Sequence, residues 1–147
     1  MTEVAVVPGT DGQKMSKSYN NTIPLFADRE TITKAVMSIK TDSKGVEEPK
    51  NPDEDNIFAL HKLFISGPEL EELRSRYTNG GIGYKESKEI LIENIDKFIA
   101  PLREKREMIA QDKDMVIDVL KVGGEKARHI ADKKLAEAKE KVGVAFY

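Results

Sequence analysis

The chain has 147 residues, of which 39% are hydrophobic and 34% charged, and its formal net charge is −2. This length fits one domain of ordinary size, and the near-neutral charge excludes a global positive field that would attract nucleic acid. The absence of cysteine excludes disulfides and thiolate metal sites, and two distant histidines, His61 and His129, argue against a histidine-rich metal enzyme or a Ser-His-Asp hydrolase.

The first 26 residues differ in character from the rest of the chain. The run Val4–Val7 is β-prone, Pro8 and Gly9 stop it, and a turn is predicted at residues 10–12. No later segment offers a convincing second strand, and a lone strand cannot satisfy its backbone hydrogen-bonding groups. We therefore interpret residues 1–26 as an extended arm, the end of a larger structure that is otherwise missing.

Helical periodicity begins after residue 27. Asp28 is a candidate N-cap for a helix whose apolar positions are Ile32, Val36 and Ile39, and residues 40–52 are predicted to form a loop. The sequence Asn-Pro-Asp-Glu at residues 51–54 predicts a second N-cap at its asparagine. The apolar face that follows consists of Ile57, Leu60, His61 and Phe64. His61 on that face is interpreted as a packed, hydrogen-bonded residue rather than a ligand.

A third helix is marked by Leu70, Leu73 and Tyr77, between a break at residues 67–68 and the glycines at residues 80–83. A long helix then carries an apolar stripe and is expected to kink or break at Pro101, because proline removes a backbone donor. The stripe consists of Leu91, Ile95, Phe98, Leu102 and Ile109.

Two more helices are predicted near the carboxy terminus. A short one over residues 115–120 is expected to end at Gly123 and Gly124, and a last one over residues 127–142 to end at Gly143. The sequence thus predicts an all-α fold, a bundle of five or six helices behind the arm. The lysines between residues 133 and 141 could form a patch for phosphates, but interleaved Glu137 and Glu140 favour an ordinary solvated helix face. No metal site is predicted.

The segment with the clearest chemistry is Lys14, Met15, Ser16, Lys17 and Ser18, in a loop preceded by glycines. Ammonium groups on flexible stems can follow a moving polyphosphate, and hydroxyls and loop amides can add hydrogen bonds to phosphate oxygens. Composition alone does not separate this reading from a common surface loop with two lysines.

Read as a motif, residues 14–18 reproduce the KMSKS signature of class I aminoacyl-tRNA synthetases, and their surroundings resemble tryptophanyl-tRNA synthetases. The flanking sequences that share this likeness are Gly-x-Asp-Gly before the signature, Tyr-Asn-Asn-Thr-Ile after it, Met-Ser-Ile at residues 37–39, Asn-Pro-Asp at 51–53, Gly-Gly-Ile-Gly-Tyr at 80–84 and Ala-Pro-Leu-Arg at 100–103. The likeness runs along nearly the whole chain. Tyrosyl-tRNA synthetases fit less well, because their loop is usually a degenerate form of the signature.

The resemblance implies an enzyme that forms tryptophanyl-adenylate from tryptophan, ATP and Mg²⁺ and then charges tRNA(Trp). In such an enzyme Lys14 and Lys17 stabilise charge on the departing pyrophosphate, Ser16 and Ser18 contact phosphate, and Met15 sets the loop position. Residues 1–26 would be the end of the catalytic domain and residues 27–147 a helical anticodon-binding domain. The family is cytoplasmic and homodimeric, and has no membrane association.

Enzymes of this family are about twice as long, and the adenine and tryptophan sites precede the KMSKS loop. We therefore expect a carboxy-terminal portion that is inactive alone and holds no bound cofactor, with tRNA contacts that cannot be assigned to particular residues. The alternative from another class is a stand-alone helical RNA-binding or scaffolding module with a relic loop. A fortuitous match is disfavoured, because the flanking likenesses are independent of the pentapeptide.

Overall fold

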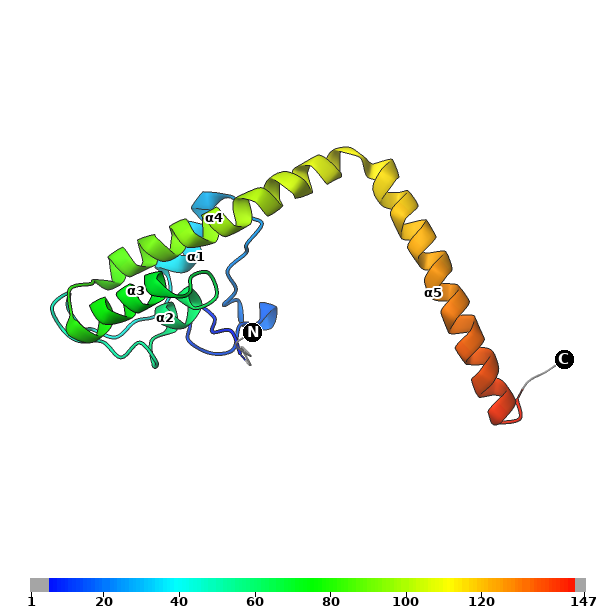
Figure 1. The fold of residues 1–147 in the computed structure, drawn as a ribbon, viewed down its shortest axis with the longest axis horizontal. Coiled ribbons are helices and arrows are strands. Elements are labelled where there is room, and N and C mark those ends of the chain that lie inside the picture. The colour runs from blue at the N-terminus through cyan, green and yellow to red at the C-terminus, as the bar shows by residue number, and fades with distance from the viewer. Residues whose placement is uncertain (1–5, 145–147) are drawn as a thin grey trace. The chain divides into compact units, whose positions relative to one another are not determined.

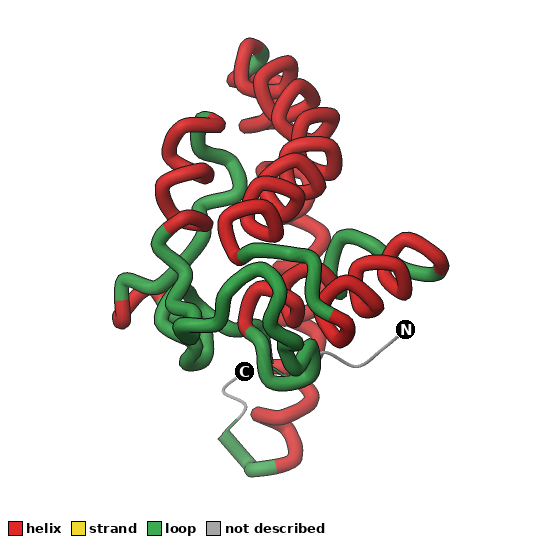
Figure 2. Tube along the Cα trace, turned by 90° about the vertical axis from the view of Figure 1, so that its left-hand side faces the viewer, coloured by secondary structure: helices red, strands yellow, loops and turns green. Residues whose placement is uncertain are grey.

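The computed structural model describes residues 6–144, which consist of helices and loops and contain no β-strand (Figures 1 and 2). The all-α class predicted from the sequence is therefore confirmed for this part of the chain. The elements are a short 3-10 helix, η1 (Lys17–Tyr19), and five α-helices: α1 (Arg29–Met37), α2 (Asn56–His61), α3 (Pro68–Asn79), α4 (Tyr84–Gln111) and α5 (Lys113–Lys141). The predicted strand residues Val4 and Ala5 lie outside the described range, and Val6 and Val7 belong to no strand.

The chain divides after Arg103 into two compact units. The first unit contains α1, α2, α3 and the amino-terminal part of α4, and it holds the buried core. Ten residues, from the segment before α1, from α1 and the residues after it, and from α2 and α4, form the larger cluster: Ile23, Ile32, Val36, Ile39, Ile57, Leu60, Leu91, Ile92, Ile95 and Ile99. A smaller cluster joins Phe58, Ile65, Leu73, Tyr77 and Ile82. The segment after the KMSKS signature contributes Ile23 to this core, and Met15 of the signature packs against it.

Local sequence explains how the first helices begin. The Asp28 side chain accepts a hydrogen bond from the Thr31 backbone N–H at 2.7 Å, so the predicted N-cap of α1 is confirmed. The predicted N-cap at Asn51 is wrong: Asn51 caps a turn instead, and Asp55 begins α2 by accepting from the Phe58 N–H at 2.8 Å. In α3, Pro68 occupies the first position after Gly67, as the break at these residues implied.

His61 is fully buried in α2. Its Nε2 lies 3.1 Å from the carbonyl oxygen of Ser87 and 3.2 Å from the Ser87 Oγ. Tyr77 reaches the same hydroxyl at 2.6 Å. Burial lowers the pKa of His61 to about 4, so the ring is neutral at physiological pH. The interpretation of His61 as a packed, hydrogen-bonded residue is confirmed.

The helix has no break at Pro101, one of the two outcomes predicted there, and the helix end predicted at Gly123 and Gly124 is absent. Helix α4 continues through Pro101 to Gln111; because Lys97 and Pro101 are exposed, water can take the place of the missing backbone donor. Helix α5 continues through Gly123 and Gly124, neither of which has a positive φ, whereas Gly143, at φ 73°, follows its end. A glycine pair weakens a helix but ends it only where the backbone turns left-handed.

The buried face of α4 also differs in part from the predicted stripe. Leu91 and Ile95 are buried as expected, but Ile99 takes the next buried position. Phe98 is 56% exposed and meets Phe64 edge to face, with ring centroids 5.8 Å apart, a spacing typical of aromatic pairs. The +4 spacing therefore persists through Ile99, where the sequence pattern had suggested a +3 step.

The second unit contains the end of α4 and α5. No residue of α5 is buried, and its lysines alternate with acids; Lys134, for example, pairs with Glu137 at 2.9 Å. The interleaving on which the solvated-face interpretation depended is therefore present in the structure. No helix within residues 6–144 combines the length and the apolar character needed to cross a membrane.

Candidate functional site

The KMSKS segment lies in a tight loop that folds back on the residues before it. The Met15 N–H donates to the Val7 carbonyl at 2.9 Å, and the Gly9 N–H donates to the Gln13 backbone carbonyl at 2.7 Å. Pro8 and Lys14 form an isolated antiparallel bridge. The turn between the two bridged segments places Gly12 at φ 85°, where a Cβ would lie 2.6 Å from the Asn56 side-chain nitrogen. The positive φ favours glycine here, and a side chain at this position would also displace the Asn56 carboxamide.

The structure brings the five predicted site residues together in one short segment, with different surroundings. Lys14, Lys17 and Ser18 are exposed, and Met15 packs against the larger core cluster. Ser16 is half-buried and caps η1 by accepting a hydrogen bond from the Ser18 N–H at 3.3 Å. Met15 is thus an anchor on the body, and the lysines before and after it project from an anchored loop.

The ammonium groups of Lys14 and Lys17 are free to meet a ligand. Over residues 6–144, neither side chain has a hydrogen bond or an ion pair. Two cations three residues apart, with the Ser16 and Ser18 hydroxyls between and beside them, suit a chain of phosphates that carries several negative charges. The local geometry can therefore supply electrostatic stabilisation to a ligand that carries several negative charges.

A residue that the sequence analysis did not assign, Asn21, holds this loop together. Asn21 is only 2% exposed, and its side-chain oxygen accepts a hydrogen bond from the Ser16 N–H at 2.7 Å. Its amide nitrogen donates to Asp11 at 2.8 Å and to the Lys14 carbonyl at 3.2 Å. The pair of asparagines after the signature was the available signal, but Asn20 is exposed and the sequence did not show which one is buried.

The loop is also attached to the segment that follows α1. The Thr10 N–H donates to the Asn21 carbonyl at 2.9 Å, and the Thr10 carbonyl accepts from the Lys40 N–H at 2.8 Å. Lys88 of α4 is buried and donates to the Met37 and Ile39 carbonyls at 2.9 and 2.7 Å, which fixes the end of α1 next to this attachment. The position of the loop is therefore tied to the packing of α1 on α4.

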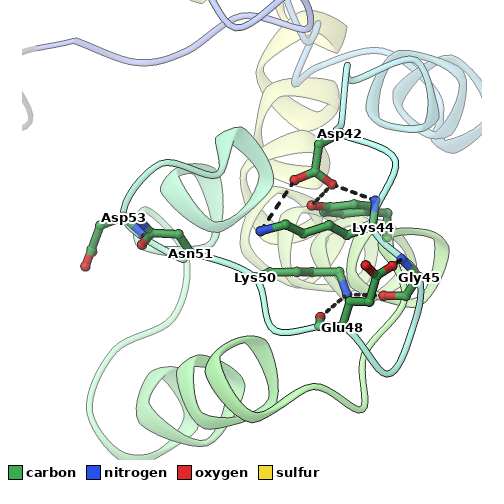
Figure 3. A network of polar contacts seen from close by, with 8 residues as sticks. Asp42, Lys44, Gly45, Glu48, Lys50, Asn51 and Asp53 are labelled. Carbon is green, nitrogen blue, oxygen red and sulfur yellow. Dashed lines mark hydrogen bonds and ion pairs between the residues drawn. The ribbon is translucent and has the colours of Figure 1, made fainter.

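A second polar network lies in the loop between α1 and α2 (Figure 3). Lys50 is buried and donates to the Gly45 carbonyl at 2.6 Å and the Glu48 carbonyl at 3.1 Å. The Tyr84 hydroxyl donates to Asp42 at 2.6 Å, and this bond lowers the pKa of the Asp42 carboxyl. The Lys50 bonds close the loop on itself, and the Tyr84 bond joins the loop to the first residue of α4, so the network stabilises the loop.

The part of the chain that the structure describes contains no group of three or more His, Cys, Asp or Glu side chains able to hold a metal ion.

The comparisons with known proteins agree with the KMSKS likeness. Residues 1–100 match the family model described as tRNA synthetases class I (W and Y). The tryptophan–tRNA ligase of Rhodopirellula baltica is 45% identical over 140 residues, which is 95% of this chain and 44% of that protein. The tryptophan–tRNA ligase of Fusobacterium nucleatum is 47% identical over 144 residues, 98% of this chain and 44% of that protein.

Among solved structures, the tryptophanyl-tRNA synthetase from Campylobacter jejuni complexed with ADP and tryptophan matches with a TM-score of 0.83 and 42% identity, covering 97% of this chain and 45% of that one. The resemblance inferred from the sequence is thereby confirmed. The chain spans less than half the length of these relatives.

Proposed function

Because the chain belongs to the class I tRNA synthetases of the tryptophan and tyrosine group, we propose that it supplies the ATP-handling loop and the helical tRNA-binding domain of a tryptophan–tRNA ligase. The observation that carries this proposal is the pair of unpaired ammonium groups, Lys14 and Lys17, held in a KMSKS loop whose surroundings match tryptophan–tRNA ligases along the chain. The identity of 45–47% with those ligases favours tryptophan over tyrosine as the amino acid.

In the proposed reaction, the tryptophan carboxylate attacks the α-phosphorus of ATP, which enters as its Mg²⁺ complex. The bond from that phosphorus to the bridging oxygen breaks, and pyrophosphate leaves with the electron pair. Negative charge grows on the departing phosphates, where Lys14 and Lys17 lie; Ser16 and Ser18 add hydrogen bonds. Charge stabilisation that grows toward the transition state accelerates the step. The terminal adenosine hydroxyl of tRNA(Trp) then attacks the activated carbonyl and releases AMP.

The division of labour along the chain is part of the proposal. Residues 1–26 act as the end of the catalytic domain, with the loop, and residues 27–147 as the anticodon-binding domain. The adenine and tryptophan sites belong to the remaining part of a full-length ligase, which acts as a homodimer in the cytoplasm. Catalysis requires these sites and the loop to be oriented together.

The test is a chimera in which residues 6–144 replace the matching segment of the Campylobacter jejuni enzyme. Tryptophan-dependent exchange of pyrophosphate into ATP should be restored, and the isolated chain should show none. Lys17→Ala should lower kcat by about 10²–10³-fold while the dissociation constant of tryptophan stays close to that of the unsubstituted chimera. A folded chimera without exchange, or a Lys17→Ala variant that only weakens tryptophan binding, would contradict the proposal.

The alternative, a stand-alone RNA-binding or scaffolding module, makes a different prediction for the same chimera. A relic loop would not support adenylate formation, and Lys17→Ala would then have no rate to lower. The matched substitution Lys85→Ala, on the exposed first turn of α4, controls for the loss of a surface charge elsewhere in the chain.

A further inference from the structure

We infer that Asn21 is a positioning residue for the phosphate-handling loop: its buried carboxamide sets where Lys14 and Lys17 stand relative to the helical body. This inference deepens the proposed function and rests on it. In this proposal Asn21 does not contact substrate and acts only through the backbone of the loop.

The contacts of Asn21 join three separate points of the loop. Its Oδ1 accepts from the Ser16 N–H, which lies between the two lysines in sequence, and its Nδ2 donates to the carbonyl of Lys14 itself. The same nitrogen donates to Asp11 in the preceding turn. One carboxamide therefore fixes the backbone of the first lysine, the residue that caps η1 before Lys17, and the turn that attaches to the body.

The chemistry of the position calls for an amide. Both an acceptor and two donors are used, and a carboxylate of the same size could accept from Ser16 but could not donate to the Lys14 carbonyl. It would also face the Asp11 carboxylate, which now accepts a hydrogen bond from Asn21. That bond is the main reason why the pKa of the Asp11 carboxyl is below its ordinary value.

The preceding turn is shaped around the carboxamide. A Cβ at Gly9 would lie 2.4 Å from the Asn21 Cγ and Nδ2, a distance at which one of the groups has to move. The Asn21 backbone carbonyl is held as well, by the Thr10 N–H. Thus Gly9 leaves the room that Asn21 fills, and Thr10 continues the connection to Lys40 after α1.

Loss of the carboxamide should leave Lys14 and Lys17 charged and exposed but no longer fixed. The two lysines act in the proposed reaction on charge that grows in the transition state, so misplacement should lower kcat more than it alters tryptophan binding. A displacement of about 1 Å can cost about 10²-fold in rate. The expected signature is therefore a split between kcat and the KM for tryptophan.

The experiment uses the chimera described above with Asn21→Asp, and with Asn20→Asp as the matched control. Both substitutions make the same chemical change on neighbouring residues, but Asn20 is exposed and sits at a positive φ of 51° that aspartate tolerates. Asn21→Asp should lower the kcat of pyrophosphate exchange by about 10²-fold with an unchanged KM for tryptophan. Asn20→Asp should resemble the unsubstituted chimera.

Gly9→Ala provides a second route to the same point, because it displaces the carboxamide without changing its chemistry, and it too should lower kcat. Amide hydrogen exchange at Ser16, measured on the full chain, reports the loop independently of activity and should accelerate in both variants. An active chimera in which Asn21→Asp and Gly9→Ala keep full kcat would overturn this inference alone. An unsubstituted chimera without exchange would overturn the proposed function, and the inference with it.

Discussion

The buried His61 should make the free energy of unfolding fall as the solution is acidified. Its pKa is about 4 in the folded chain against an ordinary value of 6.5, because burial disfavours the charged ring. Above pH 6.5 the ring is neutral in both states, and no stability depends on it. Below pH 6.5 His61 binds a proton in the unfolded chain but not in the folded chain. Stability therefore decreases until about pH 4, where His61 is protonated in the folded chain as well.

The size of the effect follows from the two pKa values. At about 1.4 kcal/mol for each pKa unit, the interval from 6.5 to about 4 corresponds to a loss of about 3 kcal/mol in total. About 2 kcal/mol of this should appear between pH 7 and pH 5, where ordinary carboxylates stay ionised. Urea unfolding of the full chain at these two pH values measures the difference directly.

Substitution of each histidine separates the buried ring from other groups. His61→Gln should be less stable than the unsubstituted chain at pH 7, but its stability should no longer fall toward pH 5. His129→Gln, at an exposed position of α5, should retain the full pH dependence. Equal free energies of unfolding at pH 7 and pH 5 in the unsubstituted chain would refute the reasoning, and so would a loss that persists in His61→Gln.

Three further substitutions test the packing of the fold. Lys88→Met should lower the free energy of unfolding by about 2 kcal/mol, because the carbonyls of Met37, at the end of α1, and of Ile39 lose their donor; Lys85→Met, on an exposed side chain, should change it little in the same urea titration. Asp28→Ala should cost about 1 kcal/mol through loss of the α1 N-cap, measured by thermal unfolding. Gly124→Ala should raise helicity by circular dichroism and stabilise α5 by about 0.5–1 kcal/mol, whereas a helix that ended there would be disrupted.

Sequence reasoning succeeded where one local signal determined the structure. Asp28 is a cap residue directly before apolar residues at helical spacing, and α1 begins there. It failed where two similar signals competed: Asn51 and Asp55 are both cap residues, and the burial of Ile57 and Phe58 placed the start of α2 at the later one. The choice between Phe98 and Ile99 on α4 was likewise made by packing, which local spacing does not contain.

The site shows the same division. Lys14 and Lys17 were assigned because the signature is a short contiguous motif, and their role in phosphate handling stays a prediction. The contribution of Asn21 was not accessible, because its partners are backbone groups and a carboxylate brought close by the turn at residues 9–13. Such contacts can be identified only when the three-dimensional structure of the loop is known.

The two buried lysines give the chain an internal reference for chemical labelling. Lys50 and Lys88 have their ammonium groups bonded to backbone carbonyls, whereas Lys14 and Lys17 face solvent. An acylating reagent should modify the loop lysines quickly and spare the buried pair for as long as the chain stays folded. Peptide mass spectrometry of one labelled sample would then report two quantities together: ATP would protect Lys14 and Lys17 in a working ligase, while any acylation of Lys50 and Lys88 would measure the unfolded fraction.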